Sequence, residues 1–325
     1  MAMIPPWEPE QQRYALSERV YLLKEDKIEW GIYCSVYYNA EYNGFFKDQG
    51  YEFEGWRDPF WIYEGEARIG GVVIAPNVMF TLFFIPPFRD ERRIVLLLKE
   101  ALISWSDPSK DIIIFEVLPD QVELLGRAGF WPSAFRCRWM QRPTEAFVVK
   151  WEDHFVAQTP EMIQQDGINK LLNENEIARL LYRSFAGAGS IDAIRRQQTD
   201  MQFYQEDIRE YVSYTNDLVR IASTIVVDSH TNEVIGVCLV SMQGSYPAIY
   251  NIAVHPSYTG QGIATRMLQT ALSNLNGHFP VLRLYVMQGN TAESVYYNLG
   301  FMPGPIEVQR MYIPAQTERI GSNHT

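Results

Sequence analysis

The sequence predicts an α/β protein with two tandem domains, each a central sheet flanked by helices. The length of 325 residues exceeds what one small domain needs. Five consecutive elements of the first half recur in the same order in the second half, as an internal duplication requires. The composition of 47% hydrophobic and 14% aromatic residues suits folded cores and excludes a disordered or fibrous protein.

The recurring elements are a strand–turn–strand unit with an Ile-Gly step, a strand that ends at proline, a helix, a strand, and a short helix that closes on Gly-Phe. Their shared order and nearly constant spacing favour a duplication over chance similarity. The pairs are residues 61–74 and 225–239, 80–88 and 250–258, 94–102 and 264–272, 112–117 and 281–286, and 124–130 and 295–301.

The domain boundary is expected between residues 142 and 158, where the first copy ends. We therefore predict a first domain of residues 1–150 and a second of residues 151–325. Before the second copy, residues 173–185 carry apolar side chains at helical spacing. A break at residues 186–190 and another helical stretch at residues 191–214 follow.

Residues 69–88 contain no charged side chain and are long enough to span a bilayer. Pro76-Asn77 and Pro86-Pro87 interrupt this stretch. Two buried strands joined by a turn explain it better than a membrane span, so we expect no membrane association.

Charge and cysteine usage narrow the class of partner. Lys and Arg total 28 against 39 Asp and Glu, a net charge of −11, which disfavours nucleic acid and anionic membranes and suits a cationic or amine-bearing partner. Cys34, Cys137 and Cys238 lack the spacing of a disulfide framework or a zinc site, so no metal is expected and a cytoplasmic location fits. The first residues lack the pattern of a secretory signal.

The two copies differ most where the proline-ended strand meets its helix. The second copy has a glycine loop at residues 259–264, and the first has the charged residues 89–94. A helix N-terminus offers unpaired amide N–H groups, and small residues let an anion approach them. The second loop therefore suits a bound pyrophosphate, which the two carboxylates of the first would repel.

Residues 225–314 closely resemble the GNAT superfamily of acyl-CoA-dependent N-acyltransferases. The family's phosphate loop reads Q/R-x-x-G-x-G/A, and Thr259, Gly262 and Ala264 occupy its three defined positions. Thr259 replaces the usual Gln or Arg. The resemblance implies two tandem GNAT-like domains, each with a central mixed, mostly antiparallel sheet, in which residues 1–150 are degenerate and lack the CoA loop and residues 151–325 are catalytic.

The resemblance also implies the site for acetyl-CoA, the co-substrate. In the family the strand before the loop splays from its neighbour, and its backbone binds the pantetheine arm and the thioester oxygen. Amides of the loop and the first helical turn hold the pyrophosphate, and an Asn lies beside the CoA arm. The corresponding residues are Ile252, Ala253 and Val254 on the strand, Thr259, Gly260, Gln261, Gly262, Ile263, Ala264 and Thr265 in the loop and helix, and Asn290.

Tyr296 matches the position of the family's usual general acid, four residues before Gly300. A tyrosine hydroxyl has an unperturbed pKa of about 10 and can protonate a departing thiolate at neutral pH. Leu125 stands at this position in the first copy, which also indicates that the first copy has lost catalysis.

The general base is left open by the sequence. Many relatives use a Glu on the strand before the loop, but residues 248–258 contain no carboxylate. Asn251 is placed to order a water in the cleft, although an amide cannot take the proton itself. His255 precedes the strand-end proline, where a structural role is favoured, and Glu293 and Glu206 remain without support from a pattern.

These observations predict an acetyl-CoA-dependent N-acetyltransferase that acts on a primary amine of a small molecule by direct attack. A protein or peptide acceptor is the alternative enzyme, and a CoA-binding module without turnover is the alternative outside enzymes. A homodimer is compatible with the sequence.

Overall fold

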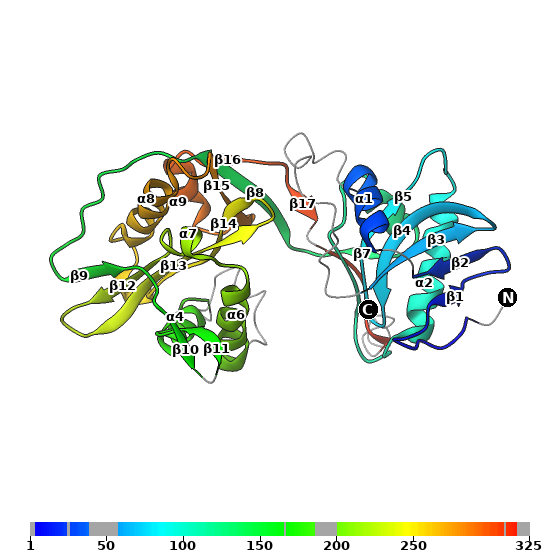
Figure 1. The fold of residues 1–325 in the computed structure, drawn as a ribbon, viewed down its shortest axis with the longest axis horizontal. Helices are drawn as coiled ribbons and strands as arrows, with labels where there is room; N and C mark the ends of the chain where they lie inside the picture. The colour runs from blue at the N-terminus through cyan, green and yellow to red at the C-terminus, as the bar shows by residue number, and fades with distance from the viewer. Residues whose placement is uncertain are drawn as a thin grey trace, which may run out of the picture. The chain divides into compact units, whose positions relative to one another are not determined.

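The computed structural model describes residues 4–24, 27–38, 58–165, 167–185, 200–308 and 310–316. The chain forms two compact units, Met1–Arg136 with Glu307–Thr325 and Cys137–Ile306, and each combines one large sheet with helices (Figure 1). Within the described ranges, no helix is both long and apolar enough to cross a membrane.

The first unit contains an eight-stranded sheet. Neighbouring strands are antiparallel except β5 and β6, which are parallel. The uncharged stretch of residues 69–88 contributes β4, a turn and β5, so the predicted pair of buried strands is confirmed. In sheet order the strands are β1 (Arg13–Ala15), β2 (Val20–Leu23), β3 (Pro59–Glu64), β4 (Ala67–Ala75), β5 (Val78–Phe84), β6 (Ile112–Phe115), β18 (Arg310–Ile313) and β7 (Trp131–Pro132).

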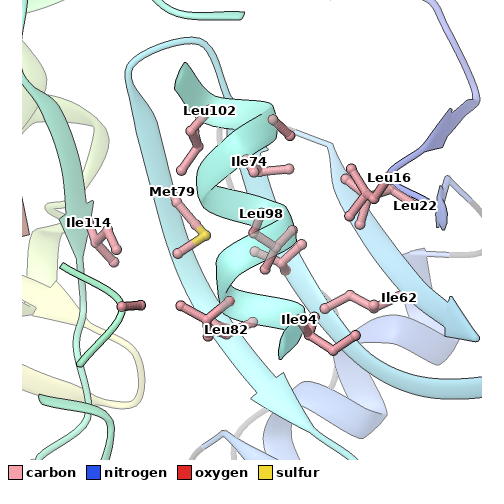
Figure 2. Close-up of a cluster of buried hydrophobic side chains, with 14 of the residues drawn as sticks. Leu16, Leu22, Ile62, Ile74, Met79, Leu82, Ile94, Leu98, Leu102 and Ile114 are labelled. Carbon is pink, nitrogen blue, oxygen red and sulfur yellow. The ribbon is translucent and has the colours of Figure 1, made fainter. Parts of the chain in front are cut away.

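Helices cover both faces of this first sheet. On one face, α2 (Glu91–Trp105) places Ile94, Leu98 and Leu102 at helical spacing against sheet residues that include Met79 (Figure 2). The short α3 (Gln121–Arg127) packs into the same core. The opposite face packs against α1 (Lys27–Tyr37) through an aromatic cluster that includes Trp30.

The second unit contains a seven-strand path in which only β14 and β15 are parallel neighbours. Both sheets are thus mixed and mostly antiparallel, as predicted. In sheet order the strands are β16 (Met302–Pro303), β8 (Arg136–Pro143), β15 (Val281–Met287), β14 (Tyr246–Val254), β13 (Glu233–Gln243), β12 (Thr224–Asp228) and β9 (Phe155–Gln158). The remaining strands are the hairpin β10 (Met162–Gln165) and β11 (Ile168–Leu171), and the short β17 (Glu307–Val308) before β18.

Two helix layers also cover the second sheet (Figure 1). One face packs against α8 (Ile263–Leu275) and α9 (Glu293–Asn298). The other packs against α4 (Glu174–Phe185) and α6 (Met201–Ser213). The short α7 (Asp217–Arg220) follows α6 in the chain and contributes Val219 to the core on the α8 side. Both predicted helical stretches before the second copy therefore contain helices, and residues 186–199 lie outside the described residues.

The five repeated elements are present in both units, down to the turn that follows the short helix. In the first unit the Phe130 N–H donates to the Leu125 carbonyl at 3.1 Å, and in the second the Phe301 N–H donates to the Tyr296 carbonyl at 3.0 Å. The glycine before each phenylalanine has a positive φ, 86° and 82°. Leu125 and Tyr296 are therefore equivalent in structure as well as in sequence.

The two units divide the chain differently from the expected boundary near residue 150. The short strands that directly follow the Gly-Phe turns, β7 and β16, stay in the sheet of their own copy. A later strand of each copy joins the sheet of the other: β8 pairs with β15, and β18 pairs with β6. Both pairings are antiparallel and follow the whole length of the shorter partner. This reciprocal exchange transfers residues 137–150 to the second unit and residues 307–325 to the first.

The glycine of the repeated Ile-Gly step lies close to a neighbouring element in both units. A Cβ at Gly70 would lie 2.4 Å from the Phe83 carbonyl oxygen, and at its counterpart Gly236 a Cβ would lie 3.0 Å from Ile263. Any side chain at Gly70 must therefore push two neighbouring strands, β4 and β5, apart.

We expect Gly70→Ala to lower the free energy of unfolding by about 1–3 kcal/mol because of this overpacking. Urea unfolding followed by tryptophan fluorescence would measure the change. Gly126→Ala is the matched control, since a Cβ on that helical glycine has no neighbour within 4 Å and alanine favours a helix. Equal unfolding midpoints for the two variants would contradict the steric explanation.

Candidate active site

The parallel contact between β14 and β15 ends early. Its register contains only the pairs Ala248–Arg283 and Ile249–Leu284, although β14 continues to Val254 and β15 to Met287. The two strands therefore part in the middle of the sheet, and the divergence that the family resemblance implied is present.

The backbone of β14 beyond this point has a defined direction. The His255 N–H donates to the Ile235 carbonyl at 2.7 Å, on the side of β13. Backbone groups of successive residues in a strand point to opposite edges, so those of Ile252 and Val254 face the opening and those of Ala253 face β13. Ser184 of α4 already donates to the Val254 carbonyl at 3.1 Å. Of the three strand residues predicted to bind the pantetheine arm, Ile252 and Val254 are the two oriented to do so.

The glycine loop leads directly into α8. Gly260 and Gly262 adopt φ values of 79° and 74°, a region that other residues rarely enter. Gly262 is the N-cap of α8 and supplies no side-chain cap. The N–H groups of Ile263, Ala264 and Thr265 therefore remain available at the positive end of the helix dipole.

The rest of the loop is exposed, as a nucleotide-binding site requires. Gly260 and Gln261 are exposed, and the Thr259 hydroxyl donates to the Pro256 carbonyl at 2.9 Å, which closes the turn η1 (Pro256–Tyr258). Thr259 thus has a local structural role in place of the long polar side chain that the family usually has there.

Arg266, in the first turn of α8, is a residue that sequence reasoning missed. Its Nη1 donates to the Gln261 carbonyl at 2.8 Å, and its Nη2 lies 3.5 Å from Glu152. The guanidinium therefore places positive charge beside the loop. Its position four residues after Gly262, on the same helical face, is the signal that could have identified it.

Tyr296 and Asn290 occupy the two ends of the segment that follows β15. Tyr296 is only 6% exposed and packs edge-on against Phe301, with 6.1 Å between ring centroids. The Asn290 side-chain oxygen accepts from the Ala292 N–H at 2.9 Å, which fixes the turn before α9. Their predicted roles as general acid and CoA contact remain predictions.

A β-bulge lies at the point where β14 leaves β15. In the pairing with β13, Leu239 opposes Asn251 and Val240 opposes Ile249, so Tyr250 is the extra residue. A bulge redirects side chains locally, and here the neighbours Tyr250 and Asn251 both reach Asp207 of α6. Tyr250 donates its hydroxyl to Oδ1 of Asp207 at 3.1 Å, and Asn251 donates its amide to Oδ2 at 2.7 Å.

Asp207 is the second residue that sequence reasoning missed. The strand itself has no carboxylate, but α6 supplies one to the bulge. Asn251, predicted to order a water, is 8% exposed and uses an amide hydrogen to hold this carboxylate. Burial, and then the charge of Asp207, raises the pKa of Tyr250, so its hydroxyl stays a donor to the carboxylate at neutral pH.

The other candidate bases have structural partners. His255 accepts from the Ser257 N–H at 3.3 Å through Nδ1 and caps η1, as expected for a structural residue. Glu293 forms an ion pair with Arg138 at 3.0 Å and accepts from the Gly289 N–H at 2.8 Å. Glu206 is exposed and accepts from Gln202 at 2.8 Å.

In the first unit the equivalent opening is closed by side chains. β5 and β6 also form only two parallel pairs, Val78–Ile113 and Met79–Ile114. Beyond them, the Thr81 hydroxyl of β5 donates to the Glu116 carboxylate at 2.9 Å, and the buried Gln121 amide donates to the Leu82 carbonyl at 2.7 Å. The first contact joins β5 to the residue that directly follows β6, and the second joins β5 to α3.

The second unit lacks both bridging side chains. The parallel pairs of the two units shift the sequence pairing of these strands by one residue and place Val286 at the position of Glu116. Aligning the Gly-Phe turns places Ala292 at the position of Gln121. Neither side chain can donate or accept a hydrogen bond. At these two positions the second unit therefore offers no side-chain bridge, and a ligand could make these contacts instead.

Comparison with known proteins assigns the second unit. Residues 191–301 match the model of the Acetyltransferase (GNAT) family, so the chain contains a GNAT domain. A search of curated protein sequences finds no match.

Solved structures share the fold of the chain. A GCN5-related N-acetyltransferase from Sphaerobacter thermophilus is 13% identical over 93% of this chain and 97% of its own, with a TM-score of 0.61. A GNAT-family acetyltransferase from Colwellia psychrerythraea is 12% identical over 90% and 98%, with a TM-score of 0.50. A tandem GNAT protein from the clavulanic acid biosynthesis pathway is 13% identical over 79% and 82%, with a TM-score of 0.49. The first of these structures shares its fold with nearly the whole chain. The repeated elements show that this fold has two related halves, and the GNAT match lies in the second.

We expect Gly262→Glu to abolish measurable CoA binding, because it adds a carboxylate at the helix N-terminus where the pyrophosphate would lie. Isothermal titration calorimetry with CoA would test this. Gly277→Glu is the matched control: Gly277 also has a positive φ, 83°, but follows the opposite end of α8. Wild-type affinity in Gly262→Glu would refute the loop assignment.

Proposed function

We propose that the protein is an acetyl-CoA-dependent N-acetyltransferase whose second unit transfers an acetyl group to a primary amine of a small molecule. The GNAT domain supports acetyl transfer from acyl-CoA in general terms. The choice of acceptor is our inference from the charge of the chain and from the side chains around the opening.

One observation carries this proposal: the two polar side chains that make contacts at the diverging strands of the first unit are replaced by Val286 and Ala292 in the second. In the first unit, Glu116 and Gln121 satisfy polar groups at the strand edge. In the second unit, Val286 and Ala292 cannot make such hydrogen bonds, so a bound molecule would have to make them. A pantetheine arm, which carries amide donors and acceptors, has the chemistry to take their place.

We assign the binding of acetyl-CoA to backbone groups. The N–H and C=O groups of Ile252 and Val254 would hold the pantetheine arm, and the N–H groups from Gly262 to Thr265 would hold the pyrophosphate. Arg266 adds a fixed positive charge beside that loop. These contacts are independent of the side chain at position 259, so Thr259 does not weigh against the assignment.

The reaction is a direct acyl transfer. The acceptor nitrogen, as a neutral amine, attacks the acyl carbon, a C–N bond forms and the C–S bond breaks. The acceptor ammonium loses two protons in the overall reaction, and the CoA thiolate gains one. The net result is the release of one proton to solvent. Tyr296 is the residue that we assign to protonating the thiolate.

Two further features support a small cationic acceptor in a reducing compartment. The net charge of −11 favours an amine over an anionic substrate. Cys34, Cys137 and Cys238 are buried and form no disulfide among the described residues, and we propose a cytoplasmic location on that basis.

We expect Tyr296→Phe to lower kcat by about 10- to 1,000-fold without weakening CoA binding, because the variant keeps the ring but loses the proton. Thiol release from acetyl-CoA in the presence of an amine would measure turnover. Tyr297→Phe, which changes the adjacent exposed tyrosine, should behave as wild type. Unchanged turnover in Tyr296→Phe would remove the acid assignment.

The same assay separates the alternatives. Release of thiol with amino-terminal or lysine peptides but not with small amines would point to a protein acceptor. Tight CoA binding without thiol release on any amine or peptide would instead indicate a binding module.

A further inference from the structure

The proposed reaction requires a group that brings an amine to the thioester, and Asp207 is placed to do so. Its partners Tyr250 and Asn251 directly follow Ile249, the last residue of β14 that pairs with β15. The carboxylate is therefore anchored where the strands part. Asp207 is partly exposed, so a small molecule can reach it.

Neutral donors hold this carboxylate in a fixed orientation. Each oxygen receives one hydrogen bond, Oδ1 from Tyr250 and Oδ2 from Asn251, and Tyr250 also contacts the Asp207 carbonyl at 3.2 Å. A carboxylate oxygen can accept two bonds, so each keeps capacity for another donor. The arrangement preserves the negative charge while fixing its position.

No protein cation neutralises that charge within the described part of the chain. Two other shielded carboxylates of this unit have arginine partners: Glu174 pairs with Arg209 at 2.8 Å, and Glu293 pairs with Arg138 at 3.0 Å. Asp228, which is 5% exposed, is held by neutral donors in the same way as Asp207. Among the described residues Asp207 forms no such pair. A shielded charge without a counter-ion favours binding of a cation from solution.

The surrounding side chains suit an organic cation. The rings of Tyr214 and Tyr250 lie 6.4 Å apart at 30°, and ring faces attract ammonium groups. The Tyr214 hydroxyl donates to the Glu210 carboxylate at 3.3 Å, which adds a second negative charge on the same helix.

We propose that Asp207 binds the ammonium group of the acceptor at the point where β14 and β15 diverge, and so makes the site specific for primary amines over alcohols. This assignment rests on the proposed function. Strand β14 has no carboxylate, and Asp207 supplies one from helix α6.

Calorimetry of the full-length protein saturated with CoA tests the proposal without turnover. The probes are 1,4-diaminobutane and 2-phenylethylamine, with 1,4-butanediol and 2-phenylethanol as uncharged counterparts. We expect at least one amine to bind and its matched alcohol not to bind.

Asp207→Asn should weaken amine binding, and raise the amine KM, by about 10- to 100-fold, the effect of losing a hydrogen bond to a charged group. Its affinity for CoA should stay at the wild-type value, which also shows that the variant is folded. Tyr250→Phe, which keeps the carboxylate but removes one of its donors, should give a smaller change in the same direction. Glu176→Gln removes one negative charge from α4, where Glu176 pairs with Arg179 at 3.2 Å, and should change neither affinity.

Equal amine affinity in wild type and Asp207→Asn would overturn the assignment, as would an equal loss in Glu176→Gln or no amine binding by wild type. A different result would contradict the proposed function. A protein that binds an amine through Asp207 but releases no thiol from acetyl-CoA would refute acetyl transfer and leave the amine site standing.

Discussion

The short parallel contact between β14 and β15 is the constraint on which the second unit depends. Two residue pairs are enough to align the strands, and the separation beyond them exposes strand backbone in the middle of a sheet, where it would normally be paired. The bulge at Tyr250 lies at the same point and turns two side chains toward α6. One local departure from regular pairing thus produces both an edge for a linear polar ligand and a support for the carboxylate of Asp207.

The first unit closes the equivalent opening with its own side chains. Its strands part after the same number of pairs, but Thr81, Glu116 and Gln121 close the gap with their own hydrogen bonds. Its equivalent helix, α2, begins at Glu91 with Asp90 as N-cap, so acidic side chains lie at the positive end of the helix dipole. If acetyl-CoA binds the second unit as proposed, these polar side chains of the first unit stand in for contacts that the ligand makes in the second.

Periodicity was sufficient to predict the repeated strands and helices, the uncharged hairpin and the glycine loop, because each is specified by residues close together in the chain. The exchange of β8 and β18 was not predictable in this way, since an alternating pattern indicates a strand but not which sheet it joins. Asp207 was missed for a related reason. Its contact with Asn251 spans 44 positions and depends on a bulge that no local sequence pattern predicts. Arg266, in contrast, could have been predicted from helical spacing.

The reciprocal exchange of strands also affects the order in which the protein can mature on the ribosome. The sheet of the first unit needs β18, and residues 310–313 are translated only after the whole second unit. Until then β6 presents an open edge, which is a site for mispairing with other nascent chains. The duplicated halves therefore cannot fold one after the other as independent modules, and the first of them must wait for the second.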